Sequence, residues 1–405
     1  MTGSIESEAQ RLALAGIVVA GLTHILIYAF ILAPYALKGY ADFSIFYTAG
    51  TVVRSGGAAQ LYSYDIQRQV QQHCCAAPLP ALIYNHAPHE ALLFVPLSMF
   101  DYSTAYSLWN FINLTALFLI SFVLRRYLPG WLPHWTLLPL AAAGSYPFLA
   151  LFAQGQDSLL LMLVYTAVFF SFKTKRPLIA GACLALGTFK PQLIIPFLFI
   201  LFIRRQWRAV SGFVIGTVFL ALCSALTFGK SVVLGYFDFL VKFNRLPAEV
   251  SIVYPALMPN LRGLFVTMLD GRLPPHVITL LVIVVSSLLL WVAARFPKTG
   301  DESQISMALA TTVLISYHLY VHDAGLFLVA AVLGFGTLRT RYARIVASAA
   351  IVPWFIFPAI QGIMNHHLGG LLAILVIGFC CALWLDAVAS KNDSAQLRFA
   401  PVACD

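Results

Sequence analysis

Apolar runs of membrane-spanning length follow one another along the chain from residue 11 to residue 387. A transmembrane α-helix needs about 20 apolar residues, so the pattern predicts an all-α, multi-pass membrane protein with about 10–12 transmembrane helices. The first run, residues 11–33, is longer than the core of a signal peptide and lacks a clear cleavage site, which predicts a retained span. Because the runs leave no room for a soluble domain, we expect one integral membrane domain over residues 1–405.

The distribution of Lys and Arg predicts the topology, because short cytoplasmic loops are enriched in basic residues. Basic clusters lie at residues 125–126, 173–176, 204–208, 295–298 and 339–344. With these clusters inside, residues 34–100 form a long first external loop, residues 229–275 form a second, and both termini lie inside. Within the first loop we expect residues 43–54 and 64–72 to form helices on the membrane surface.

The stretch 177–203 has basic residues at both ends, which a single crossing does not allow in this topology. Its middle contains Lys190-Pro191, and proline breaks a helix while disfavouring helical geometry in the residue before it. Two arms of about 12 residues rise only about 18 Å each, short of the roughly 30 Å hydrocarbon layer. We predict a half-height hairpin whose tip brings Lys190 into a protein-lined cavity. One tilted, kinked helix is the alternative.

Composition agrees with a membrane protein and narrows the partners. Hydrophobic residues make up 60% of the chain and charged residues 10%, against about 25% charged in a soluble domain. The formal net charge of +9 could suggest nucleic acid as a partner, but in a membrane protein the distribution of Lys and Arg matters more than their total. We therefore expect a lipid bilayer and no nucleic acid as partner. The seven cysteines show neither metal-ligand spacing nor a disulfide framework, and the adjacent pairs Cys74-Cys75 and Cys380-Cys381 are expected to be inert.

The topology gathers polar side chains at the outer surface. Asp42 follows the first span among aromatic residues, where lost hydration makes a carboxylate the better proton acceptor that a general base requires. A solvated loop acid, or an N-cap for the next helix, is the alternative. Lys190 at depth indicates a site or a pathway, unless its ammonium snorkels to the interface along its aliphatic stem.

Two tight turns reach the same surface. The first, Gln154 to Asp157, either satisfies the backbone of a sharp reversal or contributes to the site. The second contains His318 and His322, four residues apart and followed by Asp323. This spacing can bind zinc on a helix, but no HExxH pattern occurs, so we predict no metal site and no cofactor while leaving a divalent cation open. The pair His366-His367 lacks supporting partners and is expected to be structural.

Several soluble-enzyme chemistries are excluded. The chain has no Walker loop, no dinucleotide fingerprint and no Gly-x-Ser-x-Gly elbow. A nucleotide donor also needs polar loops on a cytoplasmic fold, for which the chain has no room. A donor group available at the outer face would have to be carried by a lipid, and a cavity beside Lys190 suits a lipid phosphate.

Short motifs in a characteristic order resemble glycosyltransferase family 87, membrane enzymes of the GT-C superfamily. They cover most of the chain between about residues 40 and 340. One stretch, Asn85-His86-Ala87-Pro88, departs from the tyrosine and closely following prolines that are more usual in the family. The matching stretches are Asp42-Phe43 with Tyr47 and Ala49, Leu61-Tyr62, Tyr84 with Pro88, Gly155-Gln156, Lys190-Pro191 with Arg204 to Trp207, Asn260 to Gly263, and His318 with Asp323.

The resemblance implies a GT-C-like bundle that transfers mannose or a related hexose from a polyprenyl-phosphate donor to a glycolipid or polysaccharide acceptor. The active site would face the periplasm or exterior of a cell membrane, in a bacterium. Asp42 would be the general base of an inverting transfer, and His318 would contact the phosphate or share in proton handling. Lys190, Arg262 and His322 would bind the donor phosphate.

The resemblance further implies residues that contact the sugar or the acceptor. Phe43, Tyr47 and Tyr84 would stack on a sugar, although aromatic residues of a membrane interface belt are an equal alternative. Gln156 and Asp323 complete this group, and Asp323 would also help to orient His318.

Two other functional classes remain open at this point. A transporter would use Asp42, Lys190 and His318 as a proton pathway, and a broken helix at Lys190-Pro191 fits a transporter's midplane site. Two long outer loops and the lack of repeat symmetry speak against it. A noncatalytic subunit derived from the enzyme is the third possibility, against which stands the joint presence of the acid, the cation and the histidine.

Overall fold

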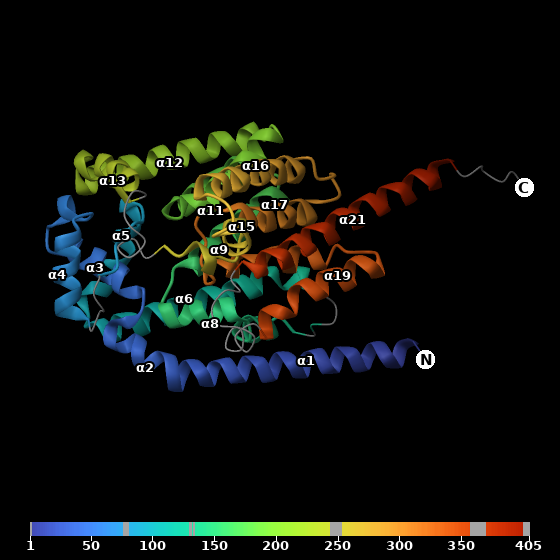
Figure 1. Cartoon of the computed structure of the whole chain (residues 1–405), viewed down its shortest axis with the longest axis horizontal. Helices are drawn as coiled ribbons and strands as arrows, with labels where there is room; N and C mark the ends of the chain where they lie inside the picture. Colours follow the sequence, from blue (N-terminus) through green and yellow to red (C-terminus); the bar gives the residue numbers. More distant parts are fainter. Residues whose placement is uncertain are drawn as a thin grey trace, which may run out of the picture.

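The fold is all-helical, as the sequence predicts. The computed structural model describes residues 2–75, 81–128, 132, 134–243, 253–356 and 370–399, and these residues form helices and turns without a strand (Figure 1). The longer helices are α1 (Thr2–Ile27), α3 (Phe43–Arg54), α4 (Tyr64–Cys74), α5 (Pro88–Phe94), α6 (Tyr102–Leu124), α7 (Leu137–Ala143), α8 (Tyr146–Gln154), α9 (Ser158–Lys173), α10 (Pro177–Ala185), α11 (Pro191–Ile203), α12 (Trp207–Phe228), α13 (Lys230–Phe243), α15 (Leu261–Leu269), α16 (Pro275–Ala294), α17 (Asp301–Ile315), α18 (Phe327–Phe335), α19 (Arg341–Ile351) and α21 (Leu371–Phe399).

The described residues contain 5 helical segments that are long and apolar enough to cross a membrane, or up to 6 if the bent pair α7 and α8 counts as one span. The multi-pass fold is therefore confirmed, with fewer full-length spans than the expected 10–12. Length explains the difference, because several apolar helices have only 10–17 residues. The five segments are Gln10–Arg54, Tyr102–Tyr127, Trp207–Phe228, Pro275–Ala294 and Leu371–Ser390.

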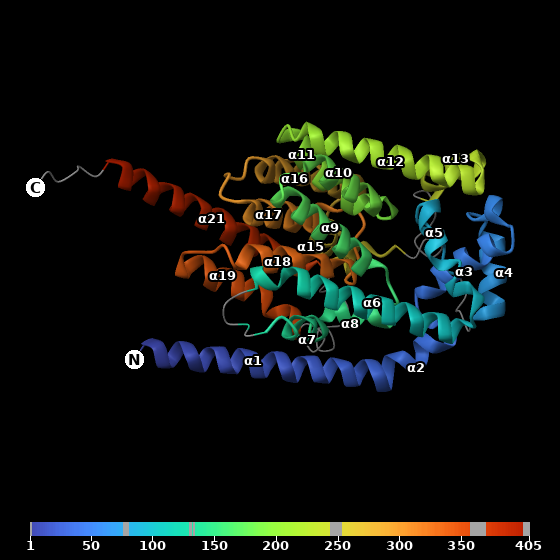
Figure 2. The ribbon, with the colours of Figure 1, turned by 180° about the vertical axis from the view of Figure 1, so that it is seen from behind.

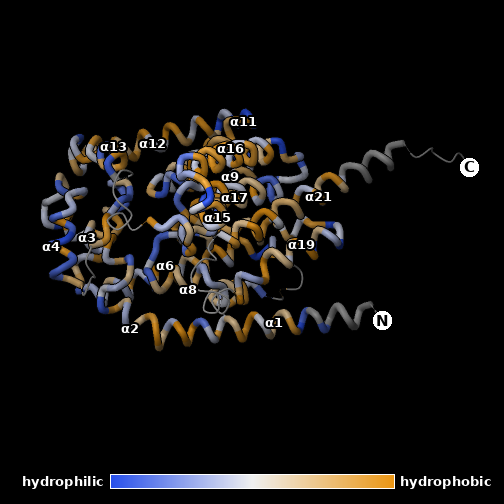
Figure 3. Tube along the Cα trace, in the orientation of Figure 1, coloured by the Kyte–Doolittle hydropathy of each residue, from blue (hydrophilic) through white to orange (hydrophobic). Residues whose placement is uncertain are grey.

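The helices that follow the first span gather at one end of the bundle. The expected first external loop contains α3, α4 and α5, which lie near α13 of the second loop, at the left in Figure 1. The helix over residues 43–54 is not on the surface, because Phe43 and Phe46 are fully buried against Phe94. In Figure 3, α4 is mainly hydrophilic, whereas the bundle helices are mainly hydrophobic. The first loop is thus a packed layer with an aromatic core of its own.

The predicted hairpin at residues 177–203 is present. Lys190 has non-helical backbone angles, φ −119° and ψ 70°, between a short 3₁₀ turn and α11. Its ammonium contacts Ser158 at the beginning of α9. The far end of α11 lies instead beside the end of α16, where the Arg204 Nε donates to the Ala294 carbonyl oxygen over 3.1 Å. A tight turn at residues 174–176 joins the end of α9 to α10, so α10 runs back toward the start of α9 and reaches Lys190 there. Helix α11 then leads away from Lys190, so the chain reverses at this residue.

The basic clusters meet at the opposite end of the bundle, which we name the basic end. There Lys175 lies 3.3 Å from Asp301, and Lys173 pairs with Glu302. The Lys173 ammonium also lies 5.9 Å from the centre of the Tyr127 ring, next to the first basic pair. The start of α1 and the end of α21 point to this side, at the right in Figure 1. The predicted grouping of basic segments is therefore present in the fold.

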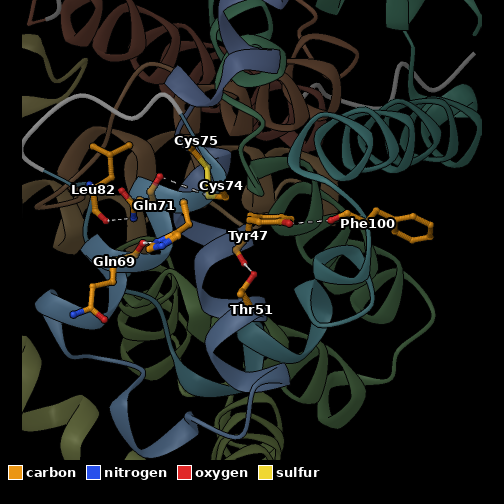
Figure 4. The surroundings of a disulfide bond; sticks show 9 residues. Tyr47, Thr51, Gln69, Gln71, Cys74, Cys75, Leu82 and Phe100 are labelled. Carbon is orange, nitrogen blue, oxygen red and sulfur yellow. Dashed lines mark hydrogen bonds between the residues drawn. A yellow bond between two sulfur atoms is a disulfide. The ribbon is translucent and has the colours of Figure 1, made fainter.

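The expectation of inert adjacent cysteines is wrong for the first pair, because Cys74 and Cys75 form a disulfide at the end of α4 (Figure 4). One turn earlier, the side-chain amide of Gln71 makes two hydrogen bonds to the backbone of Leu82. Gln71 Oε1 accepts from the Leu82 N–H over 3.0 Å, and Gln71 Nε2 donates to the Leu82 carbonyl oxygen over 2.7 Å. Helix α4 thereby holds the segment that leads into the site described below. Cys380 and Cys381 remain free thiols. The pair His366-His367 lies outside the described residues.

Helices α10 and α12 lie side by side (Figure 2), and glycines allow their backbones to come into contact. A Cβ atom at Gly181 would lie 1.8 Å from the Ala209 carbonyl oxygen, and one at Gly212 would lie 2.0 Å from the Leu178 carbonyl oxygen. Neither position accepts a larger side chain without moving the helices apart. This contact positions the hairpin, and with it Lys190.

We therefore expect Gly181→Ala to destabilise the protein by about 1–3 kcal/mol, the usual effect of overpacking a tight contact. The measurement is the apparent melting temperature of the purified protein in detergent. The matched control is Gly16→Ala in α1, where a Cβ atom meets nothing within 4 Å. Alanine favours a helix over glycine, so the control should melt at the same temperature or slightly higher. Equal melting of both variants would contradict the described packing.

Candidate active site

Asp42 lies between the end of the first span and α3, held by two glutamines. Its backbone N–H donates to Gln154 Oε1 over 2.9 Å, and its Oδ2 accepts from Gln156 Nε2 over 2.7 Å. Asp42 occupies the N-cap position of α3, but its side chain makes no capping hydrogen bond. The N-cap alternative is therefore wrong, and the carboxylate is oriented by the distant turn at residues 154–157.

The conformation of this turn depends on Gly155. The residue ends α8 with φ 61° and ψ 43°, a left-handed conformation that glycine adopts without strain. A Cβ atom there would also lie 2.8 Å from the Phe43 Cβ and 3.0 Å from the Tyr106 ring. Glycine thus lets the turn pack against the aromatic core while Gln156 and Asp157 reach the site.

Lys190 is the centre of a buried ionic cluster. Its Nζ lies 2.6 Å from Asp157 Oδ1, contacts the Asp323 carboxylate, and donates to Ser158 Oγ over 3.1 Å. Ser158 in turn donates to Asp323 Oδ1 over 2.7 Å. Lys190 is only 3% exposed, so the snorkelling alternative is wrong. A buried ammonium requires such partners, and Asp323 serves here as a counter-ion.

The two histidines of the second turn lie beside this cluster. His322 Nε2 is 3.6 Å from Asp323 Oδ2. Burial lowers the pKa of His318 to about 4, and burial also lowers the pKa of His322. Both rings are therefore neutral near pH 7, and each can donate one hydrogen bond and accept another. Among the described residues, no third metal ligand lies with this pair at binding distance.

These groups face one cavity of ≈ 120 Å³. A cavity of this size holds several water molecules or a small polar group. The acid that the sequence placed after the first span and the lysine of the hairpin tip thus meet in space. The lining residues are Asp42, Ile45, Leu82, Ile83, Asn85, His86, Gln156, Lys190, Gln192, His318, Tyr320, His322 and Asp323.

A second titratable cluster adjoins the cavity at the stretch 85–88, which departs from the family pattern. His86 Nδ1 lies 2.8 Å from Glu90 Oε2 and 3.4 Å from Asp157 Oδ2. Burial opposes charge on His86, but the two carboxylates outweigh it and raise the pKa of His86 to about 10. Burial raises the pKa of Glu90 to about 8. Burial would also raise the pKa of Asp157, but Lys190 and His86 outweigh it and hold that pKa well below its usual value.

The comparison with known families decides the class of the protein. The profile of glycosyltransferase family 87 matches residues 84–319, more than half of the chain. The chain belongs to glycosyltransferase family 87. No curated protein and no solved structure matches it significantly. As a family 87 member it is a membrane glycosyltransferase, and the transporter hypothesis is not carried further.

The family motif Asn260 to Gly263 makes hydrogen bonds to residues 316 and 317, which lead into the turn that contains His318 and His322. Asn260 Oδ1 accepts from the Gly263 N–H over 2.9 Å, capping α15, while its Nδ2 donates to the Ser316 carbonyl oxygen over 2.7 Å. Arg262 stacks on the Tyr317 ring at 4.1 Å and donates to the Tyr317 carbonyl oxygen over 3.2 Å. Arg262 does not line the cavity, and its charge contributes to lowering the pKa of the neighbouring His318.

The aromatic residues expected at the sugar do not line the cavity. Phe43 and Tyr84 are fully buried, and the Tyr47 hydroxyl donates to the Phe100 carbonyl oxygen over 2.9 Å. The aromatic side chain that lines the cavity is Tyr320, which the sequence motifs did not single out. Alternation along the extended turn could have indicated Tyr320 as a cavity residue, because every second side chain of an extended segment points the same way. Residues 318, 320 and 322 line the cavity, whereas Leu319 between them is fully buried.

The lysine cluster gives a stability prediction. Lys190→Met leaves Asp157 and Asp323 without their cation, and breaking a buried ion pair in this way costs about 3–5 kcal/mol. We expect a large fall in the apparent melting temperature in detergent, partly reversed by adding Asp323→Asn. The control is Lys242→Met, which breaks an exposed pair with Asp238 and should cost below about 1 kcal/mol. Equal effects of the two lysine substitutions would contradict the buried cluster.

Proposed function

We propose that this glycosyltransferase moves a hexose, mannose in the first instance, from a polyprenyl-phosphate donor to a hydroxyl of a glycolipid or polysaccharide. The observation that carries the proposal is the shared cavity, which Asp42, Lys190, His318 and His322 all line. Asp42 offers a base for a hydroxyl group, and the lysine and the two histidines offer a cation and hydrogen-bond donors for a phosphate. The basic end faces the cytoplasm in this proposal, so the cavity opens at the outer face of the cell membrane.

Asp42 acts as the general base. Gln156 engages Oδ2, and among the described residues no hydrogen bond reaches Oδ1, which leaves that oxygen for the acceptor. The acceptor hydroxyl gives its proton to Asp42, and its oxygen forms a bond to the anomeric carbon. The bond from that carbon to the phosphate oxygen breaks, and the electron pair leaves with the lipid phosphate. A single displacement of this kind inverts the anomeric carbon.

The phosphate lies against the histidine turn and Lys190. Lys190 is already paired with two carboxylates, so its net field in the cavity is reduced. The neutral imidazoles of His318 and His322 donate hydrogen bonds without adding a further buried charge. Arg262 acts from behind His318. Hydrogen-bond donors that are fixed where negative charge develops usually contribute more to rate acceleration than any other group in an active site.

The decisive test measures sugar transfer from labelled polyprenyl-phosphate mannose to endogenous acceptors in membranes with equal amounts of each variant. We expect Asp42→Asn to lower the rate about 10²–10⁴-fold, the usual contribution of a general base. Asp65→Asn, which changes an exposed carboxylate of α4, should keep the wild-type rate. Undiminished transfer by Asp42→Asn would remove the base from Asp42. Wild-type transfer from another lipid-linked hexose alone would keep the mechanism and replace mannose.

The phosphate contacts are tested by product inhibition with polyprenyl phosphate. A hydrogen bond to a charged group contributes about 1.5–3 kcal/mol, so His322→Gln should raise the inhibition constant roughly tenfold or more. His134→Gln changes an exposed histidine and should leave the constant unchanged. Asp42→Asn should also leave it nearly unchanged, because the base contacts the acceptor. An unaltered constant in His322→Gln would place the phosphate elsewhere.

A further inference from the structure

Three side chains beside the cavity have the donor atoms of a metal site, although their spacing in the sequence does not reveal one. One ligand atom from each of His86, Glu90 and Asp157 lies within 4.8 Å of the other two. His86 precedes α5, Glu90 lies in the first turn of α5, and Asp157 precedes α9. Two segments far apart in the chain thus bring one imidazole and two carboxylates together.

The cluster is buried and its ring is held in place. Glu90 and Asp157 are fully buried, and the side chain of His86 is 12% exposed where it lines the cavity. The Phe46 ring packs edge-on against His86 with centroids 5.1 Å apart, and the Tyr84 ring stacks on it at 5.7 Å. Burial and these ring contacts therefore hold the His86 imidazole beside the two carboxylates.

The charges of the site need compensation. Four carboxylates surround the cavity or adjoin it, those of Asp42, Glu90, Asp157 and Asp323. The Lys190 ammonium pairs with Asp157 and Asp323, and His86 pairs with Glu90 and Asp157, so a metal ion bound there would displace the His86 proton. Glu90 Oε1 is buried, and no described hydrogen-bond donor contacts it. Buried carboxylates in contact have to share a proton or a cation.

We propose that His86, Glu90 and Asp157 bind a divalent transition-metal ion such as Mn²⁺ or Zn²⁺ at the edge of the cavity. One imidazole nitrogen and two carboxylate oxygens form a donor set that suits these ions, whereas Ca²⁺ prefers an all-oxygen site of six or more ligands. Three protein ligands leave further positions of the ion to water or to an oxygen of a bound substrate. The site is independent of the identity of the transferred sugar.

The test uses the full-length protein in detergent, stripped with a chelator and titrated with Mn²⁺ alone while free Mn²⁺ is followed by electron paramagnetic resonance. We expect one tightly bound ion per chain. Glu90→Gln and His86→Gln should each weaken binding at least tenfold, because each removes one of three ligands. The matched controls Asp238→Asn and His134→Gln change exposed residues away from the cluster and should keep wild-type affinity.

Each outcome decides the proposal. Binding lost in both cluster variants and kept in both controls supports the site, and agreement of the two variants guards against misfolding of either one. No stoichiometric binding to the wild type would show that shared protons balance the carboxylates, and it would overturn the proposal. Wild-type affinity in Glu90→Gln, or equal losses in the controls, would overturn it as well. No sugar enters this assay, so its result is separate from that of the transfer assay.

Discussion

The buried ammonium of Lys190 is the interaction on which the site depends. It joins three segments that are remote in the sequence, namely the hairpin tip, the start of α9 through Asp157, and the second turn through Asp323. A charge at this depth is stable only with its counter-ions, so the three segments have to meet. The cavity lies where they meet, and the break before Pro191 lets the lysine reach it.

The turn at residues 154–157 couples Asp42, the proposed base, to the cation of Lys190. Gln154 and Gln156 orient Asp42, and the next residue, Asp157, holds Lys190. The positive φ of Gly155 allows these side chains to leave a tight reversal that is packed against Phe43. Asp42 and Lys190 are therefore both positioned by one short segment of backbone. Such preorganisation is what a transfer reaction requires, because the reacting groups need no rearrangement in the transition state.

Local patterns predicted much of this structure. The apolar runs, the basic clusters and Pro191 indicate the helices, the common end of the basic segments and the hairpin, since each depends on neighbouring residues or on overall charge placement. The pairing of Lys190 with Asp157 and Asp323 depends on packing between distant segments, so the sequence showed the lysine without its counter-ions. Phe43 and Tyr84 illustrate another limit, because an aromatic ring suits a sugar site and a buried core equally well. Glu90 carried no signal beyond its spacing of four residues from His86.

The charge balance of the cavity links the proposed role of Asp42 to the binding of the proposed donor phosphate. The lipid phosphate of the proposed donor would bring negative charge toward Asp42, Asp157 and Asp323, while both histidines of the second turn are neutral near pH 7 and Lys190 is already paired. Repulsion between these anions is strong where water is excluded. Hydrogen bonds from the imidazoles offset part of it, and a divalent ion beside Asp157 would offset more. The cluster at His86 therefore bears directly on how the proposed anionic donor would enter a cavity that is lined by the carboxylate of Asp42.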